Sequence, residues 1–146
     1  MDGATVLDLF RQIESGEDIP KISNLLKKMT VEQACAKGED WPYSILTNLA
    51  HADFWQQIWL ARILGEPRPK FKDDWRIPAP EEFHAIRKSF LSGLDTALKI
   101  VTEWPIEHKM KSDDAALHTL MSIAIHDAYH IGQIKLMARL VPQAKE

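Results

Sequence analysis

Cysteine and long apolar runs are both scarce in this chain of 146 residues. The single cysteine, Cys35, cannot form an internal disulfide, which fits a reducing compartment, and a lone cysteine more often packs in a core than acts as a catalytic thiol. No stretch approaches the roughly 18 continuous apolar residues that span a bilayer. The first residues, 1–3, have neither the positive region nor the apolar stretch of a signal peptide. We therefore expect a cytoplasmic protein without a membrane span.

The chain also has little excess of either positive or negative charge. The formal net charge is −3, and no basic run stands out. Nucleic-acid binding normally requires a clustered basic face, so we do not expect it. The sequence also has no Gly-rich phosphate loop and no Gly-x-Ser-x-Gly elbow, and its serines show no triad context. With 45% hydrophobic residues, the chain can build the core of a single domain covering residues 1–146.

Strand signals are missing too, so we predict an all-α fold. There is no run of alternating apolar and polar residues, no Asn-Gly hairpin and no internal repeat. The N-terminal part should form short pieces: an apolar stripe ending near Gly16, a second piece opening at Pro20, and a turn or two from the Thr30/Gln33 capping box up to Gly38.

Three longer helices should follow. The first should begin near Asp40, with Pro42 in its first turn, and stop at Gly65. The next should run from residue 80 to just before residue 105, and the last from about 112 to 140. The charged, proline-containing stretch 66–80 is predicted to be a long loop, and loops of this length often cover a site.

Two histidines four residues apart, His126 and His130, are the most informative feature of the last helix. At 100° per residue they lie about 40° apart, so both imidazoles can reach one metal ion. Asp127 falls in the charged sector of this helix together with Lys135 and Arg139, which places the two histidines toward the bundle. A metal needs at least three protein ligands, and a third must come from elsewhere.

The best candidate for the third ligand is His51. It lies opposite Asp53, Gln56 and Gln57, which we predict to be the solvent face of its helix. Its own stripe mixes polar, aromatic and basic side chains and is typical of a pocket wall: Ser44, Asn48, His51, Trp55, Ile58 and Arg62. No carboxylate partner is evident, and a shared divalent metal would offset the cost of burying three imidazoles. The alternative is that each histidine is hydrogen-bonded separately in the core.

The remaining histidines are assigned to the surface: His84, His108 and His118. Glu81-x-x-His84 matches one half of a di-iron motif, but that site needs a second such motif and two further glutamates. The only near match is Asp127-x-x-His130, with Asp127 on the outer face, so we do not expect a di-iron centre.

The string His126-x-x-Tyr129-His130-x-Gly132-Gln133-Ile134 resembles the C-terminal motif of the DinB/YfiT-like family of metal-binding bundles. The segment Trp41-Pro42-Tyr43-Ser44-Ile45-Leu46-x-x-Leu49-x-His51 resembles the opening of that family's second helix, apart from a Pro-Tyr insertion after Trp41. The resemblance extends from about residue 20 to residue 140. It implies an antiparallel four-helix bundle in which His51, His126 and His130 hold nickel or zinc, and a homodimer.

The resemblance also implies a class of activity, because some relatives are transferases or isomerases that use low-molecular-weight thiols. We predict a metal-dependent enzyme that activates a thiol or water toward a small-molecule substrate, as a thiol S-transferase, isomerase or hydrolase. The predicted substrate pocket comprises Trp55, Arg62, Tyr129 and Gln133. The lack of an evident general base favours thiol activation. The alternatives are a metal-binding or stress-response protein without turnover, and a purely structural bundle.

Overall fold

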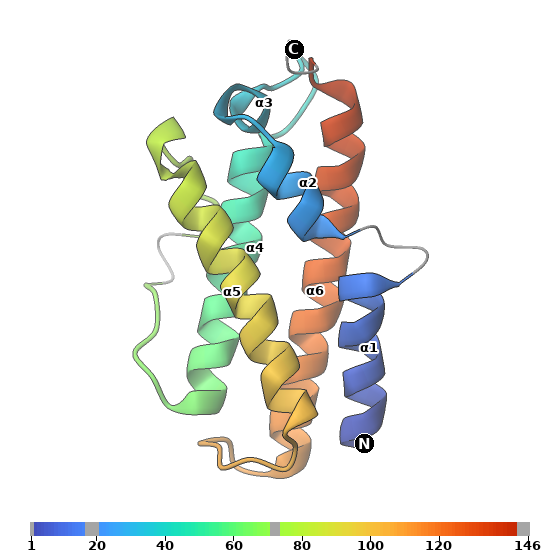
Figure 1. The fold of residues 1–146 in the computed structure, drawn as a ribbon. Helices are drawn as coiled ribbons and strands as arrows, with labels where there is room; N and C mark the ends of the chain where they lie inside the picture. Colours follow the sequence, from blue (N-terminus) through green and yellow to red (C-terminus); the bar gives the residue numbers. More distant parts are fainter. Residues whose placement is uncertain (1, 17–20, 71–73, 143–146) are drawn as a thin grey trace.

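A computed structural model describes residues 2–16, 21–70 and 74–142 (Figure 1). Within these ranges the chain is helical and contains no strand. The elements are α1 (Gly3–Ser15), α2 (Ile22–Lys28), α3 (Val31–Cys35), α4 (Ile45–Leu64), η2 (Pro80–Glu82), α5 (Phe83–Thr102) and α6 (Asp113–Leu140). None of these helices is both long enough and apolar enough to cross a membrane.

The four longer helices α1, α4, α5 and α6 pack side by side into a bundle, with α2 crossing near one end (Figure 1). Helix α4 contacts both α5 and α6, and α1 contacts the same two helices. The pairs α4–α6 and α1–α5 are antiparallel, as predicted, whereas α4 and α5 run in the same direction (Figure 1). They are parallel because the connection after α4 returns along the bundle before α5 begins.

Aromatic and aliphatic side chains from all four longer helices fill the core. Phe10, Phe83 and Phe90 are fully buried, and the apolar faces of α4 and α6 close over them. This packing holds α4 against α6 along most of their length. Polar side chains that lie at the α4–α6 contact are therefore removed from water and must find partners within the protein.

The beginning of α4 corrects the predicted boundary. The helix starts at Ile45, not near Asp40 with Pro42 in its first turn. Ser44 has an extended backbone, and its side chain accepts a hydrogen bond from the Thr47 amide, so Ser44 is the N-cap. The predicted end is confirmed, because Gly65 has φ 73° and closes the helix in the left-handed conformation.

The other boundaries are close to the predictions. Helices α5 and α6 occupy the predicted ranges, and the side chain of Ser112 caps α6. The capping box of Thr30 and Gln33 is present at α3, which ends at Cys35 before the predicted limit at Gly38. Pro20, the predicted start of the second piece, lies outside the described residues.

Candidate metal centre

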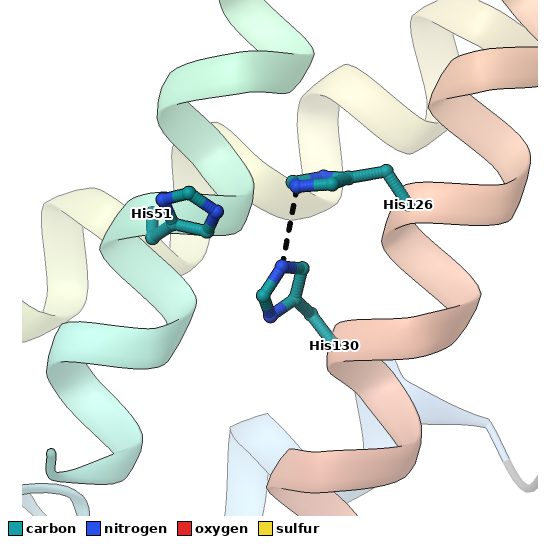
Figure 2. A group of neighbouring side chains, drawn as sticks. All are labelled: His51, His126 and His130. Carbon is teal, nitrogen blue, oxygen red and sulfur yellow. Dashed lines mark hydrogen bonds between the residues drawn. The ribbon is translucent and has the colours of Figure 1, made fainter. Parts of the chain in front are cut away.

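Three histidine side chains from two helices meet at the α4–α6 contact (Figure 2). His51 comes from α4, and His126 and His130 come from successive turns of α6. One ring nitrogen from each of the three lies within 4.8 Å of the others. The antiparallel packing of α4 on α6 therefore brings together the three residues that the sequence singles out as ligands.

The spacing of the ring nitrogens fits a metal ion. The Nε2 atoms of His126 and His130 are 3.2 Å apart. Imidazole nitrogens bound tetrahedrally to one zinc ion at about 2.0–2.1 Å would be separated by about 3.3 Å. The pair on α6 thus meets the distance requirement of a shared ion, and the ring nitrogen of His51, within 4.8 Å of both, would have to move closer to complete the set.

Two of the imidazoles are oriented through their outer nitrogens. Nδ1 of His51 lies 2.6 Å from Oδ1 of Asp74, and Nδ1 of His130 lies 2.7 Å from Oδ1 of Asn48. Both partners are acceptors, so each Nδ1 carries the proton and each Nε2 presents its lone pair. Ligating histidines in proteins are almost always oriented in this way by a carboxylate or an amide or carbonyl oxygen.

The orienting groups are themselves held by neighbours. Asp74 also accepts a hydrogen bond from Nε1 of Trp55, at 3.1 Å. The amide nitrogen of Asn48 donates to Oε1 of Gln133 at 3.0 Å, which fixes Oδ1 of Asn48 as the acceptor facing His130. Trp55 and Gln133 thus hold the side chains that orient the imidazoles.

Burial keeps the two imidazoles of α6 neutral. Burial, followed by the charges of His130 and His51, lowers the pKa of His126 to about 4. Burial, followed by the charge of His51, lowers the pKa of His130 to about 4 as well. The neutral form is the one that binds metal. Nδ1 of His126 is buried without a hydrogen-bond partner among the described residues.

Tryptophan rings wall the cluster. The indole of Trp75 stacks on the imidazole of His51, with ring centroids 3.7 Å apart and planes 13° apart. Trp59 approaches His126 edge-on, at 5.2 Å. The connection between α4 and α5 therefore does contact the site, through Asp74 and Trp75. Sequence reasoning missed both residues because a loop has no periodicity that fixes where its side chains point.

The predicted pocket residues are brought to the cluster unequally. Trp55 and Gln133 are linked to it through Asp74 and Asn48. The ring of Tyr129 lies 5.1 Å from that of His130, but the residue is 63% exposed. Arg62 lies in the last turn of α4, about 16 Å along the helix axis from His51. The structure thus does not place Arg62 beside the imidazoles.

The predicted solvent faces of α4 and α6 are wrong at Gln56 and Asp127. Both are fully buried, and Nε2 of Gln56 donates to Oδ2 of Asp127 at 2.8 Å. The cause is α5, which packs on this side of α4. Its Ser89 hydroxyl donates to Oδ1 of Asp53, at 2.8 Å. Burial raises the pKa of Asp127 to about 8 and that of Asp53 to about 6.

A glycine in α5 makes this buried contact possible. A Cβ atom on Gly93 would lie 1.7 Å from Oε1 of Gln56, so only glycine leaves room for the amide. A glycine within an otherwise regular helix often marks such a close approach. Gly93 was therefore the sequence feature that could have indicated the burial of Gln56.

The histidines assigned to the surface divide into two groups. His84 and His118 are exposed, as predicted. The prediction is wrong for His108, whose side chain is only 9% exposed. Its Nε2 lies 2.8 Å from Oδ1 of Asp113, and its ring stacks on Trp104 with centroids 5.8 Å apart. This histidine anchors the connection between α5 and α6.

No protein-family model, curated protein or solved structure matches this chain.

Proposed function

We propose that this chain is a metal-dependent enzyme of the DinB/YfiT-like type, with nickel or zinc held by His51, His126 and His130. The observation that carries the proposal is the convergence of three ring nitrogens within 4.8 Å. Two of these imidazoles already donate their outer N–H groups to acceptors, which is how ligating histidines are usually oriented.

A divalent ion bound by three neutral imidazoles lowers the pKa of a coordinated water or thiol toward neutrality. The protein's own groups hold the protons that keep the site ready. Asp74 holds the proton on Nδ1 of His51, and Asn48 holds the proton on Nδ1 of His130. Trp75 covers one face of His51 and limits the access of water to it.

The arrangement around Asp74 favours a thiol over water as the activated group. Among the described residues, Asp74 is the carboxylate in contact with the cluster, and each of its oxygens forms a hydrogen bond, one with His51 and one with Trp55. Hydrolysis normally requires a general base that is free to accept a proton. We therefore favour transfer or isomerisation with a low-molecular-weight thiol, and rank hydrolysis second.

A cavity of about 440 Å³ is lined in part by the tryptophan that stacks on His51, and it supports a small-molecule substrate. Trp75 and Tyr43 line it together with Thr47. Its volume is in the range of ligand pockets in proteins. An apolar or aromatic part of a substrate would pack against these rings.

The alternative function is a metal-binding or stress-response protein of the same fold without turnover. The engagement of both Asp74 oxygens favours it as well, since this carboxylate is already used to orient His51 and Trp55. It predicts bound metal, but no acceleration when a thiol and an electrophile are supplied. A purely structural bundle would bind no stoichiometric metal.

A homodimer is part of the proposal. Helix α6 exposes an apolar stripe formed by Ile125, Tyr129, Leu136 and Leu140, each between 58% and 63% exposed. Gly132 lies between them, and a Cβ there would meet nothing within 4 Å. The same stripe on a second copy could pack against it across a two-fold axis.

The test is metal content, measured by mass spectrometry on untagged protein beside a His126→Ala/His130→Ala variant. About one divalent ion per chain, lost in the variant, is the expected result. No metal after incubation with nickel and zinc would overturn the proposal. With metal present, thiol-transfer assays on loaded protein and variant distinguish the enzyme from the non-catalytic alternative.

A further inference from the structure

A second cavity, of about 610 Å³, lies between α5 on one side and α1 and α2 on the other. None of the three histidines of the metal centre lines it. Its volume is in the range that small-molecule ligands occupy. Of the described residues, four cationic side chains line its walls, Lys21, Lys27, Arg87 and Lys88, against two carboxyl groups, Glu14 and Asp95.

These charges are separated along the cavity. Glu14 and Asp95 lie close enough at one end to interact, and Lys21 lies close enough to Glu14 to interact with its charge. Burial, followed by the charge of Asp95, raises the pKa of Glu14. With two carboxyl groups against one lysine, this end of the cavity has no excess of positive charge.

The opposite end is cationic. Arg87 precedes Asp95 by eight residues on α5, which places it about 12 Å along the helix axis. Lys88 follows it on the same helix, and Lys27 extends from the last turn of α2. Among the residues that the structure describes, no acidic side chain lines the cavity at this end. An anion in the cavity is therefore attracted to the end that contains Arg87.

The guanidinium of Arg87 is held in place before any ligand arrives. Its Nη1 donates to the backbone oxygen of Leu26 at 3.2 Å, and its Cζ lies 5.4 Å from the ring centroid of Phe83. A guanidinium has five N–H donors, so four remain after this bond. A guanidinium held in this way suits the recognition of phosphate oxygens, and the two lysines in the same lining add positive charge.

The middle of the cavity is apolar, with Ile22, Leu91 and Leu94 in its lining. We propose that this cavity binds a small organic phosphate, with the phosphate at Arg87, Lys27 and Lys88 and an apolar body along the α2–α5 wall. This binding site is separate from the metal centre, and its existence does not depend on the proposed function.

The test is a titration of isotopically labelled, metal-free protein with phenyl phosphate, followed by amide NMR shifts. The expected result is saturable shifts at residues of the cavity, with phenol giving none and inorganic phosphate binding about tenfold more weakly, since it lacks the apolar body. Absence of saturable shifts up to about 10 mM phenyl phosphate would overturn the proposal.

Charge reversal tests the assignment of the cationic end. Lys27 and Lys88 are exposed, so Lys27→Glu/Lys88→Glu leaves the core intact. We expect at least about tenfold weaker binding. The control Lys70→Glu/Lys111→Glu makes the same charge change at exposed lysines outside the cavity and should bind as wild type does. If both variants bound phenyl phosphate equally weakly, the loss of affinity would come from net charge alone, and the proposed site would be overturned.

Binding to the metal centre is distinguished by the His126→Ala/His130→Ala variant. The proposed phosphate site predicts unchanged affinity for phenyl phosphate in this background. Loss of binding there would assign the phosphate to the imidazoles and refute the separate cavity. A failure of phosphate binding leaves the metal content of the protein, and thus the proposed function, to its own measurement.

Discussion

Asp74 and Asn48 decide which nitrogen of His51 and His130 faces the centre of the cluster. A carboxylate bonded to Nδ1 fixes the tautomer and raises the basicity of the imidazole. Asp74→Asn keeps the size of the side chain and removes its charge. We expect metal affinity about 10- to 100-fold weaker, measured by competition with a chromogenic chelator.

The matched control for this change is Asp8→Asn, which alters an exposed carboxylate on α1. Its metal affinity should equal that of wild type. If Asp74→Asn also bound metal as tightly as wild type, the 2.6 Å contact with His51 would have no orienting role.

Asp127 gives the protein a pH dependence of its own. Burial raises its pKa from 3.8 to about 8, so the folded state keeps a proton that the unfolded state releases near pH 4. The contribution of Asp127 to the free energy of unfolding is fully present below pH 4 and is lost as the pH rises toward 8. Asp127→Asn should remove that loss, because the amide stays neutral and its oxygen still accepts from Gln56.

The measurement is urea unfolding of metal-free protein and variant between pH 5 and 9. As the pH rises toward 8, the free energy of unfolding of the variant should increase relative to that of wild type by up to about 1.4 kcal/mol per pH unit. A difference that does not change with pH would show that Asp127 is ionised throughout.

At the scale of single residues, the sequence predicted the three histidines but not their partners. His126 and His130 follow from helical periodicity, and His51 from the stripe on its helix. Asp74 lies in a connection, where side-chain direction depends on tertiary contacts. Its place beside His51 therefore could not be read from spacing.

At the scale of elements, the contact between α4 and α5 depends on Gly93. Alanine favours a helix over glycine by about 1 kcal/mol, but a Cβ here would lie 1.7 Å from Oε1 of the buried Gln56. We expect Gly93→Ala to destabilise the protein by about 1–3 kcal/mol in urea unfolding, because the amide must leave Asp127.

Gly132→Ala is the control for that substitution. It lies on α6, where a Cβ would meet nothing within 4 Å. The same change should be neutral or stabilise the protein by up to about 1 kcal/mol. Equal effects at the two glycines would mean that helix propensity, not the Gln56 contact, sets the outcome.

Helix ends and solvent faces could be predicted to different degrees. Gly65 and Ser112 mark their helix ends through local chemistry, so both predictions hold. Residue Gln56 was misplaced because a helical wheel gives angles but not the number of neighbouring helices. With both α5 and α6 packed against it, α4 has little solvent face left.

At the scale of the whole molecule, the cluster joins segments that are far apart in the sequence. His51 is 75 residues before His126, and the two meet only when α4 and α6 have docked. A ligand that binds only the folded state stabilises it by about 2.7 kcal/mol at 100 times its Kd. Zinc or nickel should therefore raise the unfolding temperature measured by calorimetry.

The His126→Ala/His130→Ala variant should show no such increase. An equal increase in this variant would place the metal elsewhere on the chain.

The all-helical architecture followed from the absence of strand patterns. The parallel direction of α4 and α5 did not, because periodicity carries no information on how a long connection returns.

The stripe on α6 makes a further prediction for the whole molecule. Tyr129→Glu/Leu136→Glu should shift the protein from dimer to monomer in analytical ultracentrifugation, since charge on both copies would oppose contact. Ile77→Glu, at a site 85% exposed on the α4–α5 connection, should leave the dimer intact. A wild-type protein that sediments as a monomer would remove the dimer from the proposal.

Because Trp75 stacks on His51, its fluorescence should report on the metal site. An indole in contact with an imidazole is sensitive to what that imidazole binds, and the ring planes here differ by only 13°. Paramagnetic nickel should quench this indole, whereas zinc, with its filled d shell, should not. The difference in emission between wild type and Trp75→Phe would then report occupancy, and the identity of the ion, without any attached dye.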